Sequence, residues 1–99
     1  MMYMILGRES ESGLERRRAS REAHLARLKA LRDEGRLLLA GPLPSIDAED
    51  PGPAGFAGSL VVAEFDSLAD ARDWAESDPY VQSGAWQGVE VQPFKAVLP

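Results

Sequence analysis

The sequence has 99 residues, 44% of them hydrophobic, and a formal net charge of −5. This length predicts one domain, residues 1–99, with a modest core. Cysteine is absent, which excludes disulfides, thiolate nucleophiles and cysteine-ligated metals.

The charge is unevenly distributed along the chain. Residues 1–36 contain nine Lys/Arg and six Asp/Glu, whereas residues 37–99 contain two and ten. Because phosphate neutralisation dominates nucleic-acid affinity, an acidic chain argues against a nucleic-acid partner. The run Arg16-Arg17-Arg18 could serve a small anionic ligand, or its charges could pair with the acidic second half.

No apolar run is long enough for a membrane span, and no basic segment followed by a long apolar one opens the sequence. We therefore expect a cytoplasmic protein without a membrane partner.

The first half of the chain predicts two strands and a long helix. Residues 1–6 form an apolar run short enough for a strand, and the polar stretch 7–13 predicts a loop. Residues 14–35 predict a helix that ends at a capping glycine. Residues 36–40 predict a short strand between glycines. The stretch 41–58 holds four prolines and four glycines, so we expect a mobile loop that borders the functional pocket.

The second half predicts a strand, a helix, a helical turn and a final strand. Residues 59–65 are almost entirely apolar and predict a strand. A capping box beginning at Ser67 predicts a helix over residues 67–77. Asp78 followed by proline predicts the N-cap of a short helical turn that closes at Gly84. Residues 89–97 predict the last strand, with Pro93 indicating a sheet edge or a bulge.

The resulting order β-α-β-β-α-β is typical of an α+β, ferredoxin-like fold. This fold has a four-stranded antiparallel sheet with both helices on one face. A sheet covered on one side should alternate apolar and polar residues. Here Met2, Met4 and Leu6 alternate with Tyr3 and Ile5, so both faces of the first strand are apolar. We therefore expect a symmetric homodimer that packs sheet to sheet.

The long predicted helix carries polar residues among its leucines. Wound at about 100° per residue, Arg17, Arg21 and His24 share the arc of the leucines, whereas Arg27 lies on the outer, solvated face. His24 is the only histidine. On that arc it is either satisfied within the core or lines a cavity.

These residues limit the chemistry that the chain can support. A single histidine excludes a multi-histidine zinc site, and we expect no metal and no organic cofactor. Neither a phosphate-binding glycine-rich loop nor a nucleophile elbow is present. His24 oriented by a carboxylate would suffice for proton transfer. Asp78 is our candidate for that carboxylate, although an aspartate before proline is also a common helix N-cap.

Several short segments, in this order, resemble the YciI family. They are Arg21-x-x-His24-Leu25-x-x-Leu28, Glu34-Gly35-Arg36-Leu37-Leu38-x-Ala40-Gly41-Pro42, Asp50-Pro51-Gly52-x-Ala54-Gly55-Phe56, Gly58-Ser59, Trp74-x-x-x-Asp78-Pro79-Tyr80 and Val91-x-Pro93-Phe94-Lys95. The resemblance implies a dimeric α+β barrel with a site around a His-Asp pair, carried here by His24 and Asp78. It places Arg21 and Ser59 near that pair, and we take these two residues and Tyr80 as substrate-binding candidates.

The resemblance also suggests a class of reaction. Some related domains are similar to dehydrochlorinases or lactone isomerases that act on small ring compounds. We therefore expect a lyase- or isomerase-like enzyme for a small anionic or hydroxylated-ring metabolite. The alternative is a non-catalytic dimeric module that binds a small molecule in the same pocket.

Overall fold

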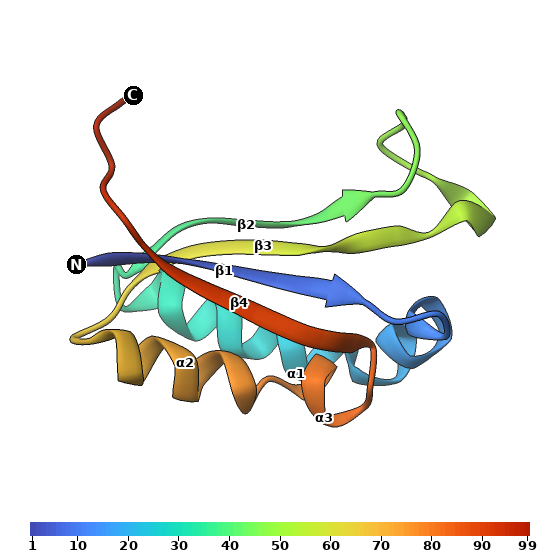
Figure 1. Ribbon diagram of the computed structural model, residues 1–99, viewed down its shortest axis with the longest axis horizontal. Helices are drawn as coiled ribbons and strands as arrows, with labels where there is room; N and C mark the ends of the chain where they lie inside the picture. The colour runs from blue at the N-terminus through green and yellow to red at the C-terminus, as the bar shows by residue number, and fades with distance from the viewer.

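The computed structural model describes residues 1–99, and their arrangement confirms the predicted α+β, ferredoxin-like fold. Four strands form one antiparallel sheet in the order β2-β3-β1-β4, and the helices cover one of its faces (Figure 1). The elements in chain order are β1 (Met2–Glu9), α1 (Gly13–Asp33), β2 (Leu37–Pro44), the 3₁₀ turn η1 (Gly52–Ala54), β3 (Phe56–Glu64), α2 (Leu68–Glu76), α3 (Pro79–Gln82) and β4 (Trp86–Phe94).

The predicted loop over residues 41–58 is wrong at both ends. Strand β2 continues to Pro44, and strand β3 already begins at Phe56. The prolines of β2 are tolerated because β2 is an edge strand, where one side of the backbone needs no ladder partner. The mobility of the shorter remaining segment, residues 45–55, stays a prediction.

The outer strands differ from their predicted bounds in the same way. Strand β1 runs on to Glu9 through the predicted loop, because it pairs with β3 on one side and β4 on the other. Strand β4 begins at Trp86 and ends at Phe94, three residues earlier at each end than predicted. Pro93 lies in this edge strand, as its chemistry predicts.

The ends of the helices follow their capping residues. The Ser67 hydroxyl accepts a hydrogen bond from the Asp70 amide at 3.0 Å, which confirms the predicted start of α2. Helix α1 ends just before Gly35, whose φ of 74° lies in the left-handed region that favours glycine. Both caps fix where α1 and α2 cross the sheet.

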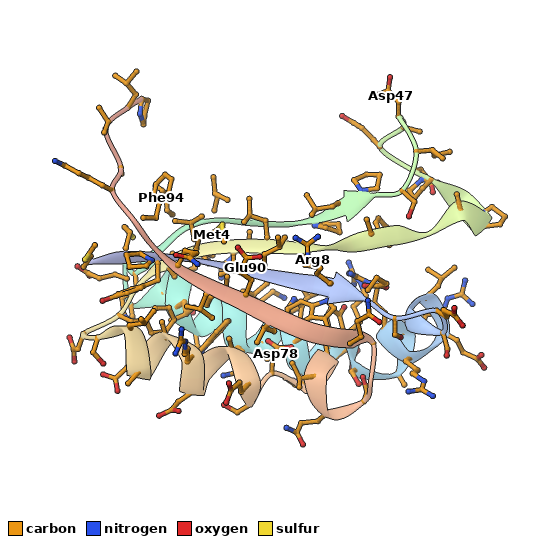
Figure 2. The ribbon with its side chains drawn as sticks, in the orientation of Figure 1. Met4, Arg8, Asp47, Asp78, Glu90 and Phe94 are labelled. Carbon is orange, nitrogen blue, oxygen red and sulfur yellow. The ribbon has the colours of Figure 1, made fainter.

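The two faces of the sheet bury different amounts of side chain. Tyr3 and Ile5 lie in the core beneath the helices, whereas the alternating Met2, Met4 and Leu6 are only half-buried. Figure 2 shows Met4 and Phe94 on the face opposite the helices. That second face carries these apolar side chains together with the exposed Arg8–Glu90 ion pair, and no helix covers it in the single chain.

One close approach brings β1 and β4 together beside the helices. Trp86 packs with Tyr80 and Ala85 in a small buried cluster. Its indole lies so near Gly7 that a Cβ atom on Gly7 would overlap the ring. The missing side chain in β1 therefore sets the position of Trp86.

None of the helices combines the length and apolar character needed to cross a bilayer.

Candidate active site

His24 and Asp78 meet in the interior, although 54 residues separate them in the sequence. His24 faces the sheet from the middle of α1, and Asp78 precedes the first residue of α3. The imidazole Nδ1 lies 2.8 Å from Oδ1 and 3.0 Å from Oδ2 of Asp78. His24 is 5% exposed and Asp78 is 0% exposed, so little water competes for this contact.

Asp78 is both a helix cap and the partner of His24. Its Oδ1 accepts a hydrogen bond from the Tyr80 amide at 2.9 Å, which is the predicted N-cap contact. Its Oδ2 accepts one from Arg27 Nη1 at 3.1 Å. An ionised carboxylate can only accept hydrogen bonds, so an ionised Asp78 requires that Nδ1 of His24 carries a hydrogen and donates it. The two interpretations of Asp78 are therefore compatible.

The other ring nitrogen of His24 is left for the cavity. Nε2 has no hydrogen-bond partner within the protein and is not enclosed among the buried unpaired atoms. With Nδ1 as the donor, Nε2 holds the lone pair of a neutral imidazole. It is thus the proton-accepting atom that the arrangement offers to a ligand.

Aromatic rings hold the imidazole in place. The Tyr80 ring stacks on it with a centroid distance of 4.0 Å and an interplanar angle of 15°. The Trp86 ring meets it edge to face at 5.5 Å. Burial raises the pKa of Tyr80 above its ordinary value, although the charges of Arg17 and Arg21 act in the opposite direction. Tyr80 therefore stays a neutral phenol at physiological pH.

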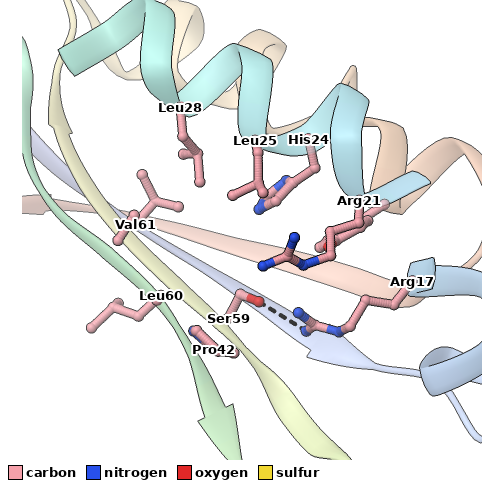
Figure 3. Close-up of a pocket in the computed structure, with 12 residues that line it drawn as sticks. Arg17, Arg21, His24, Leu25, Leu28, Pro42, Ser59, Leu60 and Val61 are labelled. Carbon is pink, nitrogen blue, oxygen red and sulfur yellow. Dashed lines mark hydrogen bonds between the residues drawn. The ribbon is translucent and has the colours of Figure 1, made fainter. Parts of the chain in front are cut away.

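A cavity of about 160 Å³ opens between α1 and the strands β2 and β3 (Figure 3). It brings together four of the five predicted site residues: Arg21, His24, Ser59 and Tyr80 line it, whereas Asp78 lies behind His24. The remaining walls come from Arg17, Leu25, Leu28, Ala40, Gly41, Pro42, Leu60 and Val61. Gly41 and Pro42 belong to β2, and residues 45–55 contribute nothing to the lining. The stretch 41–58 therefore borders the pocket as predicted, but only through two residues of strand β2 and not through an irregular loop.

Arg17 is held in a second buried polar cluster. Its Nε and Nη2 donate to the two carboxylate oxygens of Glu9 at 3.0 and 2.9 Å. Nη2 also donates to the Ser59 hydroxyl at 2.9 Å, the bond drawn in Figure 3. The guanidinium lies 4.9 Å from the Phe56 ring centroid and 4.8 Å from that of Tyr80. Arg17 is thus paired within the protein rather than left for a ligand.

Arg21, unlike Arg17, has no ion-pair partner within the protein. It lines the cavity between His24 and Ser59 in Figure 3, is exposed, and forms no ion pair with any carboxylate of the chain. A positive charge without a protein partner at the mouth of a cavity favours an anionic ligand. No group of three or more His, Asp or Glu side chains is placed to hold a metal ion.

Two contributors were missed by the sequence reasoning. Arg27, predicted on the solvated face of the helix, reaches Asp78 with its long side chain. Glu9, predicted in a loop, lies at the end of β1 and pairs with Arg17. The three-residue spacing from His24 to Arg27, less than one helical turn, is the one signal that could have indicated Arg27.

Comparison with known proteins places the chain in a family. A family model described as the YCII-related domain matches residues 1–95. The chain belongs to the YCII-related domain family. Protein YciI of Escherichia coli (strain CFT073) is 55% identical over 98 residues, covering 99% of this chain and 100% of that protein. An uncharacterized protein of Haemophilus influenzae is 54% identical over the same share of both chains.

A solved structure shares the fold of this YCII-related chain. The 5-chloro-2-hydroxyhydroquinone dehydrochlorinase of Burkholderia phenoliruptrix, in complex with 2,5-dihydroxybenzoquinone, matches it with a TM-score of 0.81. The match covers 96% of this chain and 94% of that chain at 23% sequence identity. At this level of identity, the likeness shows a common fold.

Proposed function

We propose that this YCII-related protein is a lyase- or isomerase-like enzyme whose His24 acts as general acid and base. Its substrate would be a small anionic or hydroxylated-ring metabolite. One observation carries the proposal: a buried imidazole is bonded through Nδ1 to a buried carboxylate, while Nε2 has no protein partner and the ring lines a cavity. That arrangement suits proton abstraction and return at neutral pH.

Each cavity residue has a role that follows from its chemistry. Nε2 of His24 removes a proton from a hydroxyl or an acidic carbon, and Asp78 stabilises the imidazolium that forms. Arg21 holds the oxygen on which negative charge develops. Ser59 and Tyr80 line the same cavity and contact the substrate. In a lyase-like elimination, a leaving group then departs from the substrate. In an isomerisation, the proton instead returns to another atom of the substrate.

The size of the cavity limits the substrate to about one ring. A cavity of about 150 Å³ accommodates benzene in another protein, and this one measures about 160 Å³. Leucine, valine and proline side chains supply the apolar walls that a ring would contact. The similar fold of a dehydrochlorinase bound to a dihydroxybenzoquinone supports a hydroxylated ring as the first class to test.

The test compares binding with turnover in matched variants. Hydroxylated and chlorinated benzoquinones and hydroquinones are screened by thermal shift, and each hit is followed for product formation. His24→Asn keeps an amide nitrogen near the position of Nδ1 but removes Nε2. We expect it to bind hits as the wild type does and to lose turnover by about 10²–10⁴-fold. Arg21→Met should instead weaken binding of anionic hits by about tenfold or more.

The same screen decides between the two classes of function. Hits that bind without turnover in the wild type would favour the non-catalytic binding module. Turnover that survives in His24→Asn would contradict the assignment of the base. Arg18→Met is the control, because Arg18 is exposed on the same helix and does not line the cavity.

We also propose that the bare face of the sheet packs against a second copy of the chain. By strand register Met2, Met4 and Leu6 share this face with Leu60. Phe94, 38% exposed, lies on the same face in Figure 2. An exposed apolar face of this kind is typical of a subunit interface. Sedimentation should give a dimer at micromolar concentration, and Met4→Glu should give a monomer. A monomeric wild type would contradict this proposal.

A further inference from the structure

Arg27 lies on the other side of Asp78 from His24. Its Nη1 donates to Asp78 Oδ2 at 3.1 Å, and its Nη2 donates to the Trp74 carbonyl at 2.8 Å. Its guanidinium also lies 4.2 Å from the centroid of the Trp74 ring. Although the side chain is 25% exposed, these three contacts fix its charged end against a carboxylate that no water reaches.

A carboxylate at 0% exposure needs a positive partner, because burying a lone negative charge is costly. Two groups can supply that charge to Asp78: the guanidinium of Arg27 or a protonated His24. The guanidinium does not lose its proton in proteins, so its charge is permanent. Arg27 therefore gives Asp78 a permanent positive partner that does not depend on the charge of the imidazole.

The remaining charges around His24 favour the same state. The titratable and charged groups that face it are Asp78, Tyr80, Arg17, Arg21 and, through Asp78, Arg27. The cavity residues from β2 and β3 carry no charge. Glu9 neutralises Arg17, but Arg21 has no carboxylate partner. Protonating His24 would therefore add a positive charge next to Arg21, with Asp78 already matched by Arg27.

We propose that Arg27 is a positioning residue that sets the charge state of the His24–Asp78 pair. It holds the Asp78 carboxylate ionised from outside the cavity, so that His24 donates through Nδ1 and keeps Nε2 free. The inference deepens the proposed function, on which it rests for the role of Nε2 as a base. The charge state itself can be measured without any substrate.

The experiment follows the ¹⁵N chemical shifts of the single imidazole as the pH is raised from about 5 to about 9. Arg27→Gln keeps a hydrogen-bond donor for Asp78 but removes the charge. Arg27→Lys keeps the charge but lacks the planar guanidinium that donates to both Asp78 and the Trp74 carbonyl. We expect the imidazolium to persist about one pH unit higher in Arg27→Gln, a tenfold gain in proton affinity. Arg27→Lys and the surface control Arg32→Gln should titrate like the wild type.

Two results would overturn the proposal. One is a titration of Arg27→Gln that coincides with that of the wild type. The other is a wild-type imidazole that is charged, or protonated at Nε2 instead of Nδ1, above about pH 8; this measurement needs no variant to fold. The proposed function can fail separately: if no hit is turned over but the variants titrate as expected, Arg27 keeps its role and only the catalytic assignment is lost.

Discussion

The two buried polar clusters on the helix-covered side of the sheet use the same kinds of groups differently. In one, Arg17 is paired with Glu9 and Ser59, and both carboxylate oxygens of Glu9 accept from it. In the other, Asp78 is bonded to His24 and Arg27, yet one nitrogen of the imidazole has no protein partner. Polar groups whose hydrogen bonds are all made within the protein are typical of a structural cluster, whereas the imidazole nitrogen without a protein partner is the feature on which the proposed active site rests.

We expect the largest loss of stability when Arg17 is replaced. Replacing Arg17 by Met leaves the Glu9 carboxylate, whose side chain is 7% exposed, without its partner. We expect the free energy of unfolding to fall by about 3–5 kcal/mol, as is usual when one member of a buried ion pair is removed. Urea denaturation measures this loss. Arg18→Met, on the exposed neighbour, should change stability by less than about 0.5 kcal/mol. A loss much smaller than this would contradict a structural role for the cluster of Arg17, Glu9 and Ser59.

An intermediate effect is expected at Asp78. Asp78→Asn retains the shape, but its amide nitrogen donates where the carboxylate accepted, so Arg27 or His24 loses an acceptor. Stability should fall by about 1–3 kcal/mol. The more specific expectation is that the amide donates to Nδ1 and moves the imidazole hydrogen to Nε2. Long-range ¹H–¹⁵N spectra of the one imidazole report the tautomer. An unchanged tautomer would reduce Asp78 to a helix cap.

The smallest effect is expected at Tyr80, which contacts both clusters. Tyr80→Phe keeps the ring that stacks on His24 and should cost less than about 1.5 kcal/mol at neutral pH. Because burial raises the pKa of Tyr80, the native state holds the phenol proton more tightly than the unfolded state does. The free energy of unfolding of the wild type should therefore fall as the pH rises above about 10.

Denaturation of both proteins at about pH 9 and about pH 11 isolates this contribution. The Phe variant should lose less stability than the wild type between these two pH values. If both proteins lose the same amount, the hydroxyl does not couple the clusters through its titration.

The fold and the pair His24 and Asp78 could be predicted because the patterns that indicate them lie within short stretches of the sequence. The short apolar run that predicts β1 and the caps at Ser67 and Gly35 depend on neighbouring residues only. His24 was found because a polar group on an apolar helical arc is unusual, and Asp78 was found because it begins a turn. Neither observation requires knowledge of the partner element.

The remaining features depend on contacts between distant elements. Helical spacing locates the Cα of Arg27, but its long side chain bends around to a carboxylate 51 residues away. The ends of β2, β3 and β4 are set by pairing, so prolines and glycines that would break an isolated strand lie within an edge strand here. Beyond the three-residue spacing of His24 and Arg27 and the edge position that Pro93 indicates, sequence patterns carry no direct signal for these contacts.

The hydrogen atom that Gly7 has in place of a side chain has a consequence for how relatives of this chain can diverge. A single added methyl group in β1 would displace the Trp86 ring, and that ring borders the imidazole of His24. Positions 7 and 86 should therefore change together among descendants: a larger residue at one requires a smaller ring or chain at the other. The residues that can surround the proposed site in relatives are therefore limited by a backbone position that does not line the cavity.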